Sequence, residues 1–455
     1  TGKKVLVMGL GLHGGGVGAV KFLARLGARI TVTDLRKRKD LKSSLDELSR
    51  HKGIRYVLGR HTQKYFLNAD CIIKNPGVPP NSPYLAAAKK HHIPILTDVG
   101  IFFSLCPAII IGVTGTRGKS TTAYIIWKFL SHIKRRVFLA GNIRVSVLEF
   151  LEDLKQNDIV VLELSSFQLE DLEKSTYPTS TGSSQKKSPH IAVFTNLLRD
   201  HLNRYKSIKE YARAKAVIFK FQEASDYLFI NPDDPTVLNL ASRARSHIIK
   251  PRLPVIYRKI VRSNLGAHYE SSVALAVAVA THFKIPSAVI RQVLSEFHGL
   301  PGREEETAKV RGVHFINDTT ATVPDAAIAA LARFRAHRDK CIIILIAGGM
   351  DKNLDFREFA ETIQKTVNFL VLLPGTGTEK LKSELRITNY ELRNIKEVKS
   401  MREAVRIAYG LAKKGDYILL SPGAASFGLF LNEFDRGKKF VHEVNKLKAQ
   451  ISKSK

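Results

Sequence analysis

Residues 112–122 read GVTGTRGKSTT and hold the side chains best suited to chemistry in this chain. An unbroken apolar run, PAIII, comes directly before them, and an apolar-periodic stretch, AYIIWKFL, directly after. In such a strand–turn–helix segment, backbone N–H groups at the start of the helix cradle phosphate. The segment therefore predicts a phosphate-binding loop.

The residue types in this loop indicate a nucleoside triphosphate. Gly115 and Gly118 allow the backbone to approach a ligand closely, and Lys119 can neutralise its β- and γ-phosphates. The hydroxyl of Ser120 or Thr121 can ligate Mg²⁺. The strict Walker A spacing is missed by one residue, so the motif that remains is G-T-x-G-K-S-T.

A second glycine turn lies near the start of the sequence. Gly9, Gly11 and Gly14 match G-x-G-x-x-G, and Asp34 ends the next expected strand. Taken alone, this fingerprint would suggest an NAD-dependent enzyme. Because a separate triphosphate loop follows, we favour a site for a nucleotide diphosphate that is part of the substrate.

Three further residues are weaker candidates on their own chemistry. Glu163 follows the apolar run IVVL, at a strand end where a second Mg²⁺ ligand should lie, or where a buried carboxylate is simply paired. His201, after Asp200 in RDHLNRY, is by itself more often structural. Lys215 in YARAKAVIF would usually extend its amine to water.

Apolar runs alternate with helical periodicity along the whole chain, which is typical of doubly wound parallel α/β folds. We expect three domains: a Rossmann-like domain over residues 1–98, a P-loop ATPase-type parallel sheet over 99–302, and a second Rossmann-like domain over 303–455. The polar stretch KSTYPTSTGSSQKKSP reads as a surface insertion in the second.

Composition limits the classes of partner and the cellular compartment that we expect for this protein. The 455 residues carry 72 Lys and Arg against 41 Asp and Glu, a net charge of +31. This balance suits a nucleic-acid binder, but the basic residues are dispersed and no RNA-binding aromatic motif or zinc-finger spacing accompanies them. Three scattered cysteines fit buried thiols in a reducing compartment. No apolar stretch has membrane-spanning length and the start lacks a signal-peptide pattern, so we expect a cytoplasmic protein.

Taken in order, the motifs resemble those of the Mur ligase family, the ATP-dependent amide-bond-forming enzymes of peptidoglycan precursor synthesis. The pieces span nearly the whole chain: GVTGTRGKSTT, AGNI, LELSSFQLE, RDHLNRY, YARAKAVIF, NPDD, GLPGR, INDTTAT, GGMDK and SPGAASF. Within the family, GLGLHG, LELSSFQLE and SPGAAS look most like the branch that adds D-glutamate. The resemblance implies UDP-N-acetylmuramoyl-L-alanine and D-glutamate as substrates, an acyl-phosphate intermediate, and a monomer that binds no nucleic acid.

The resemblance also implies roles for individual residues. The catalytic set is Lys119, His201, Lys215, Glu163 and Asn142. ATP contacts are Gly115, Thr116, Arg117, Gly118, Lys119, Ser120, Thr121, Arg303 and Asp318. Two Mg²⁺ sites involve Ser120, Glu163, His201 and Lys215, the last as a CO₂-derived carbamate. The UDP-sugar contacts are Leu12, His13, Asp34, Leu35, Arg36, Asn75 and Gly77, and the D-glutamate contacts are Thr322, Lys352, Ser426 and Phe427.

Some positions depart from the family pattern. Thr320 stands where a lysine usually helps to hold the amino acid's carboxylate, and Arg117 where asparagine is usual. Tyr269 and Ser272 replace common asparagines near the expected adenine site. These changes keep open a ligase for a different amino acid, and the charge keeps open a nucleic-acid-associated ATPase.

Overall fold

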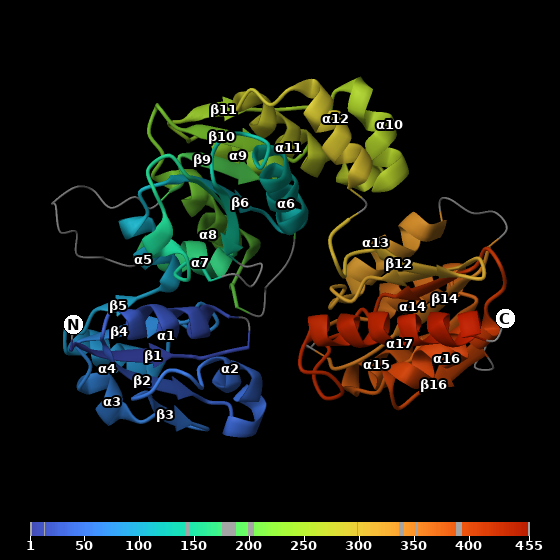
Figure 1. The fold of residues 1–455 in the computed structure, drawn as a ribbon, viewed down its shortest axis with the longest axis horizontal. Helices are drawn as coiled ribbons and strands as arrows, with labels where there is room; N and C mark the ends of the chain where they lie inside the picture. The colour runs from blue at the N-terminus through green and yellow to red at the C-terminus, as the bar shows by residue number, and fades with distance from the viewer. Residues whose placement is uncertain are drawn as a thin grey trace. The chain divides into compact units, whose positions relative to one another are not determined.

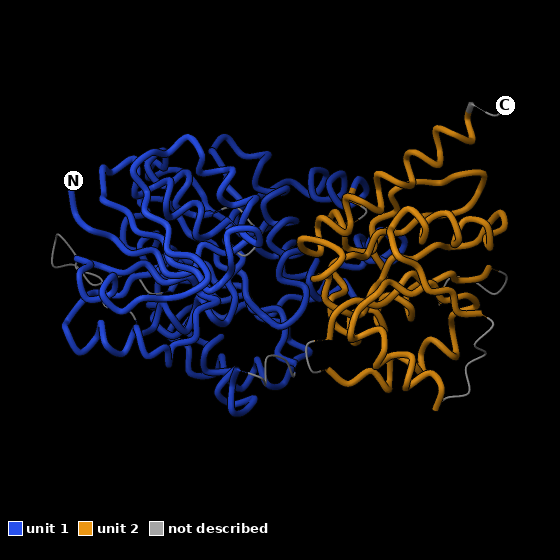
Figure 2. The backbone as a smooth tube through the Cα atoms, turned by 90° about the horizontal axis from the view of Figure 1, so that it is seen from below, with its two compact units in different colours: residues 1–263, 267–296 blue, residues 264–266, 297–455 orange. Residues whose placement is uncertain are grey.

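The computed structural model describes residues 2–12, 14–141, 146–174, 188–198, 204–297, 299–335, 341–351, 354–387 and 394–453. The chain groups into two compact units, residues 1–263 with 267–296 and residues 264–266 with 297–455 (Figure 2). The first unit holds two sheets and the second unit holds one (Figure 1). The exact domain boundaries at 98/99 and 302/303 stay predictions.

The first sheet has five parallel strands in the order β3-β2-β1-β4-β5. Its strands are β1 (Lys4–Met8), β2 (Arg29–Asp34), β3 (Arg55–Leu58), β4 (Cys71–Lys74) and β5 (Ile95–Leu96). The accompanying helices are α1 (Gly15–Arg25), η1 (Arg38–Leu41), α2 (Lys42–Glu47), α3 (Gln63–Leu67), α4 (Pro83–Lys90) and α5 (Asp98–Leu105). The strand order reverses direction between β1 and β4, so the crevice outside their carboxyl ends is the expected ligand site.

The second sheet has six parallel strands in the order β11-β10-β9-β6-β8-β7. Its strands are β6 (Ile109–Thr114), β7 (Val137–Gly141), β8 (Ile159–Glu163), β9 (Ile191–Phe194), β10 (Tyr227–Ile230) and β11 (His247–Ile249). Its helices are α6 (Lys119–Leu130), η2 (Leu151–Asp153), α7 (Ser166–Lys174), α8 (Ile208–Lys220), α9 (Pro235–Ala241), α10 (Val255–Asn264), η3 (Ala267–Tyr269), α11 (Glu270–His282) and α12 (Ser287–Glu296). The order reverses between β6 and β9, which places the phosphate loop at a switch point.

The third sheet is mixed, in the order β12-β13-β17-β14-β15-β16. Its strands are β12 (Glu305–Val310), β13 (Val313–Asn317), β14 (Ile343–Ala347), β15 (Phe369–Leu372), β16 (Ile395–Glu397) and β17 (Tyr417–Leu420). Its helices are α13 (Pro324–Arg335), α14 (Arg357–Thr366), α15 (Thr376–Ile387), α16 (Met401–Leu411) and α17 (Glu433–Lys453). β12 pairs antiparallel with β13, and the remaining neighbours are parallel.

Burial follows from the sequence pattern. The central strands β6, β8 and β17 are almost entirely buried, as expected for parallel strands covered by helices on both faces. Two apolar clusters flank the third sheet, and one extended cluster runs from the α1 face of the first sheet into the second. The predicted three-domain α/β fold is confirmed, with the antiparallel β12 as an addition.

Candidate active site

The phosphate loop joins β6 to α6 and rests on the segment that follows β9. The Thr116 N–H donates to the Asn196 carbonyl at 2.9 Å, and the Arg117 N–H donates to Asn196 Oδ1, also at 2.9 Å. The Thr195 hydroxyl donates to the Arg117 carbonyl at 2.6 Å. Because β9 neighbours β6, two segments about eighty residues apart in sequence fix one loop.

The polar side chains of the loop lie where the sequence predicted. Lys119 begins α6, and its Nζ donates to the Thr116 carbonyl at 2.8 Å, so the ammonium lies over the loop. Ser120 and Thr121 are buried in the first turn of α6. A cation and hydroxyls at a helix N-terminus suit a phosphate with its metal ion.

The two loop glycines are needed for different reasons. Gly115 has φ +145°, and a Cβ there would lie 1.9 Å from Thr195 Oγ1. Gly118 has φ +78° and caps α6, and its Cβ would lie 2.4 Å from Ser272 Oγ. The departure at Ser272 therefore packs against the loop itself, where α11 meets α6.

Glu163 ends β8 and is 2% exposed. The strand register sets it between Val113 of β6 and Gly141 of β7. Glu163 thus lies at the carboxyl edge of the sheet beside the strand that enters the phosphate loop. A carboxylate and a hydroxyl at one sheet edge form the oxygen-rich set that Mg²⁺ uses together with phosphate oxygens.

Lys215 is buried on α8 at 1% exposure, which overturns the expectation that such a lysine reaches water. Its Nζ donates to the Gly115 carbonyl at 2.6 Å and lies 4.8 Å from the centre of the Tyr211 ring. The amine therefore contacts the backbone of the phosphate loop directly.

The first glycine turn, between β1 and α1, is built around two polar side chains. Asp34, at the end of β2, accepts from the Gly11 N–H at 3.1 Å and from the Arg36 N–H at 2.9 Å. Asn75, after β4, lies against the same turn: its Cβ would be 3.0 Å from a Cβ on Gly9. The fold thus brings Asp34 and Asn75, two of the residues predicted to contact the UDP-sugar, to the same turn.

The outer members of that predicted set lie around the same turn. Leu12 is half-buried, whereas Leu35 and Arg36 are exposed. Gly77 is exposed too, and its N–H donates to Asn75 Oδ1 at 3.0 Å. All of them follow β1, β2 or β4, at the carboxyl ends of neighbouring strands.

In the second unit, three loops predicted to bind the amino acid follow neighbouring strands β13, β17 and β14. Met350 and Ala425 pair as a backbone bridge, and the Gly423 N–H donates to the Ala321 carbonyl at 2.9 Å. Ser426 is 4% exposed and Phe427 is 46% exposed. Thr322 is half-buried on the first of these loops.

Asp318 is a buried carboxyl at the end of β13. It accepts from the Ser421 hydroxyl at 2.6 Å and from the Glu304 N–H at 3.2 Å. Burial, and then the negative charge of Glu304, raise the pKa of Asp318 well above its usual range, against the lowering effect of Arg303. The charge of Arg303 thus acts on Asp318, and the ATP contact predicted for both residues stays a prediction.

Thr320 and Arg436 hold the loops of this unit in place through hydrogen bonds that the sequence did not predict. The Thr320 hydroxyl donates to the Gly302 carbonyl at 3.0 Å, so it ties a site loop to the segment that enters the unit. Arg436 of α17 is fully buried and donates to the Thr319 and Ala424 carbonyls at 2.7 and 3.1 Å. Burial lowers the pKa of Arg436 to about 10.

Four predicted site residues lie outside the described residues: His13, Asn142, His201 and Lys352. Sequence reasoning missed Thr195, Asn196 and Arg436. The first two directly follow an expected strand, a signal that could have found them. Arg436 carries no such local signal.

Comparison with known proteins extends over all three sheets. Residues 3–97 match the profile described as Mur ligase MurD-like, N-terminal domain; residues 113–251 match the Mur ligase middle domain; and residues 302–423 match the Mur ligase, glutamate ligase domain. A UDP-N-acetylmuramoylalanine–D-glutamate ligase of Roseiflexus sp. (strain RS-1) is 38% identical, over 97% of this chain and 98% of its own. The chain belongs to the Mur ligase family. A ligase of the same name from Clostridioides difficile (strain 630) is 34% identical, over 98% of this chain and 99% of its own.

Solved Mur ligases share the fold. The UDP-N-acetylmuramate-alanine ligase of Thermotoga maritima superposes with a TM-score of 0.63 at 17% identity, covering 98% of this chain and 100% of its own. The MurF ligase of Thermotoga maritima, in complex with ADP, gives 0.55 at 17% identity, covering 92% and 95%. The recognised resemblance is confirmed, and this Mur ligase is an ATP-dependent amide-bond-forming enzyme.

Proposed function

We propose that this Mur ligase joins D-glutamate to UDP-N-acetylmuramoyl-L-alanine at the expense of ATP, as a step of peptidoglycan precursor synthesis. The observation that carries the proposal is similarity over nearly the full length to ligases named for that reaction, at 38% and 34% identity. This similarity covers all three sheets, and it therefore includes both the first glycine turn, between β1 and α1, and the phosphate loop.

The chemistry requires an activated carboxylate. The terminal carboxylate of the UDP-sugar acid attacks the γ-phosphorus, the bond to the β-phosphate oxygen breaks, and ADP leaves. The D-glutamate amine then attacks the acyl carbon and loses a proton, and the carbon–oxygen bond breaks to release phosphate. The chain's part is positioning and charge neutralisation, by the loop N–H groups and Lys119 on the phosphates.

The donor set near the loop fits Mg²⁺. Ser120 and Glu163 offer a hydroxyl and a carboxylate on adjacent elements, and His201 is the proposed residue for a second ion. Mg²⁺ sites that bind nucleotides commonly use one or two protein oxygens together with substrate phosphates and water. Bound there, Mg²⁺ would neutralise the developing charge of phosphoryl transfer.

We also propose that Lys215 carries a carbamate. Its neutral amine would attack CO₂ to give N–COO⁻ and a released proton, so that a cation becomes an anion beside the metal edge. The 2.6 Å contact with the Gly115 carbonyl supports this role, because it holds the amine at the loop. Lys215→Ala should lose most activity and regain part of it with formate or acetate, whereas exposed Lys220→Ala on the same helix should retain it. Absence of any recovery would contradict the carbamate.

The second unit is proposed to supply the remaining contacts. Arg303 and Asp318 would contact ATP, and Thr322, Ser426, Phe427 and Lys352 would hold D-glutamate. A ligase for a different amino acid is the alternative, favoured by Thr320, whose hydroxyl bonds Gly302 rather than presenting a lysine charge. We further propose a cytoplasmic monomer that binds no nucleic acid. Within the described residues, no helix is both long and apolar enough to cross a membrane.

Phosphate release tests the function directly. The purified chain is given ATP, Mg²⁺ and UDP-N-acetylmuramoyl-L-alanine, with D- and L-amino acids supplied one at a time. Release with D-glutamate alone is the expected result. Release with another amino acid would keep the family and move the specificity, and release that needs no UDP-sugar acid would overturn the proposal.

A further inference from the structure

Loop 75–78, which follows β4 and faces the first glycine turn, has its carbonyls held by two cations. Lys74 Nζ donates to the carbonyls of Asn75 and Val78 at 3.4 and 3.3 Å. Arg204 Nη1 donates to the Pro76 carbonyl at 3.2 Å. Three contacts from these cations to backbone carbonyls therefore hold this loop, in addition to its internal Gly77–Asn75 hydrogen bond.

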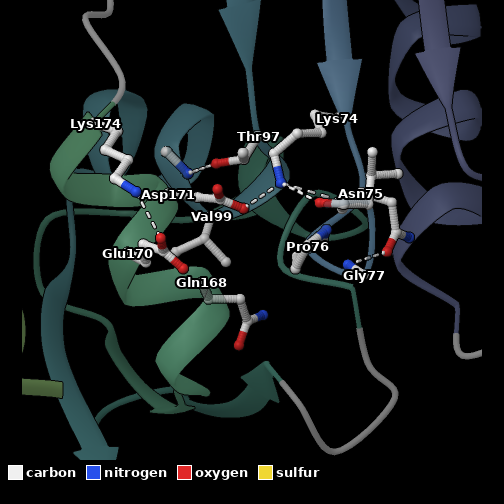
Figure 3. Close-up of polar contacts among 12 residues, drawn as sticks. Lys74, Asn75, Pro76, Gly77, Thr97, Val99, Gln168, Glu170, Asp171 and Lys174 are labelled. Atoms are coloured by element: carbon white, nitrogen blue, oxygen red, sulfur yellow. Dashed lines mark hydrogen bonds and ion pairs between the residues drawn. The ribbon is translucent and has the colours of Figure 1, made fainter. Parts of the chain in front are cut away.

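Both cations are anchored on one helix, α7, through adjacent carboxylates. Lys74 Nζ lies 2.6 Å from Asp171 Oδ2, and Arg204 Nη2 lies 3.3 Å from Glu170 Oε2. The Lys74–Asp171 side chains are 5% and 6% exposed, so this pair is buried. Figure 3 shows the Lys74 ammonium between the Asp171 carboxylate and the Asn75 carbonyl.

Helix α7 directly follows β8, the strand of the second sheet that ends at Glu163. It begins at Ser166, three residues after Glu163 ends β8. Gln168 Oε1 accepts from the Ser165 N–H at 2.9 Å, and the Gln168 N–H donates to Ser165 Oγ at 3.2 Å, which fixes the strand-to-helix turn. The loop beside the UDP-sugar turn is thus tied to the strand that presents Glu163.

A need for cohesion alone does not explain buried charges here. Apolar residues of similar volume often replace a buried ion pair at no loss of stability, because desolvation offsets the attraction. What a lysine with three directed N–H donors adds is orientation. All three N–H donors of Lys74 have partners: one carboxylate and two carbonyls of the same loop.

We infer that Lys74 and Arg204, with Asp171 and Glu170, form a clamp that sets loop 75–78, and the substrate beside it, at the distance from the phosphate loop that phosphoryl transfer to the substrate's carboxylate requires. These are positioning residues, since they reach the substrate only through the loop. The inference rests on the proposed function, and it predicts a loss in kcat rather than in binding. A misplacement of about 1 Å can cost roughly a hundredfold in rate.

The test replaces the buried pair with apolar residues, Lys74→Met with Asp171→Leu, in the full chain. We expect kcat for phosphate release to fall about tenfold to a hundredfold. The KM for ATP, and the Kd for UDP-N-acetylmuramoyl-L-alanine by calorimetry without ATP, should change less than about threefold. Lys220→Met is the matched control. It removes the ion pair between Lys220 of α8 and Glu173 of α7, which is separate from the contacts that Lys74 and Arg204 make with loop 75–78.

Each outcome decides the inference. A folded double variant with kcat within about twofold of wild type overturns it, and so does a weaker Kd with kcat unchanged. If the double variant does not fold, Arg204→Met is judged by the same criteria, since it removes the Pro76 and Glu170 contacts and leaves the buried Lys74–Asp171 pair in place. Failure of the proposed function is separate, because it would appear in the wild-type chain as a different required amino acid or no required UDP-sugar acid.

Discussion

The two glycine loops of the first unit are built from the same backbone device and differ in the charges around it. Each joins a central parallel strand to a helix whose cap is a left-handed glycine, Gly14 at φ 84° and Gly118 at φ 78°. No side chain caps either helix. In both, the helix N-terminus is left open toward the switch point of its sheet.

The residues that follow the cap differentiate the loops. Helix α6 begins with Lys119, Ser120 and Thr121, whereas α1 begins with Gly15, Gly16 and Val17. A Cβ on Gly16 would lie 2.3 Å from the Leu10 carbonyl, so this position serves close packing of the turn on its helix. Among the described residues of the two loops, it is the second loop that carries a cationic side chain, Lys119, able to neutralise phosphate charge.

Their supports also differ in charge. A carboxylate, Asp34, holds the first loop through the Gly11 N–H, whereas a neutral amide, Asn196, holds the second. A carboxylate beside the turn disfavours a high density of phosphate charge there. The glycine spacing therefore specifies the turn, and the residues next to it specify how much anionic charge the turn accepts.

Removing Lys119, the cation of the second loop, should have the largest effect on kcat of the substitutions considered. Lys119→Ala should lower kcat for phosphate release about a hundredfold to a thousandfold, because an aligned charge on the transferring phosphoryl group is lost. The Kd for UDP-N-acetylmuramoyl-L-alanine should stay near wild type. Lys128→Ala, in the last turn of the same helix, is the control. An activity loss below tenfold would contradict the assigned role.

Replacing Asp34, which supports the first loop, should weaken the binding of the UDP-sugar acid and leave the binding of ATP unchanged. Asp34 accepts two N–H groups on different oxygens, and the amide introduced by Asp34→Asn would turn an NH₂ group toward one of them. A buried donor left without its acceptor costs about 1–3 kcal/mol. We therefore expect this substitution to raise the KM for the UDP-sugar acid about tenfold while the KM for ATP is unchanged. Asp40→Asn, on the exposed η1, is the control, and an equal rise in both KM values would mean that the loops are not independent.

The fold could largely be read from the sequence because apolar runs closed by polar residues mark buried parallel strands. The run before Gly112 and the helix after Gly118 were expected and lie where β6 and α6 do. β12 was not expected: EETAKV is a polar edge strand whose burial alternates weakly, so no apolar run marks it. The glycine of the Arg311–Gly312 pair was the available sequence signal for this hairpin. In the structure both residues adopt positive φ at the turn.

The site divides in a similar way. Lys119 and Glu163 could be found because their roles depend on local sequence, at a helix start and at a strand end. Lys74 reads as the end of a strand, and its partner Asp171 is 97 residues away in sequence. Pairings of that range depend on how two sheets pack, which periodicity does not encode. For Lys215, the family resemblance supplied what its local sequence did not.

The smallest expected effect concerns Asp98, a buried carboxyl under the first loop. Asp98 Oδ2 would lie 3.4 Å from a Cβ on Gly15, and Asp98 Oδ1 accepts from the Val99 N–H at 2.8 Å. Burial raises the pKa of Asp98, and the charge of Asp171 adds to this, while the Val99 N–H and Lys74 oppose it. The carboxyl, Lys74 and Asn75 line a cavity of about 10 Å³, room for roughly one water.

A raised pKa in the folded state fixes the sign of the pH dependence. The stability contributed by protonated Asp98 is fully present below the unfolded pKa of about 3.9 and is lost as pH rises through the higher folded value. An amide at this position stays neutral at every pH, so the Tm of Asp98→Asn minus that of wild type should increase as pH rises from about 4 to 8. A difference in Tm that does not change with pH would mean that the buried carboxyl does not titrate with folding.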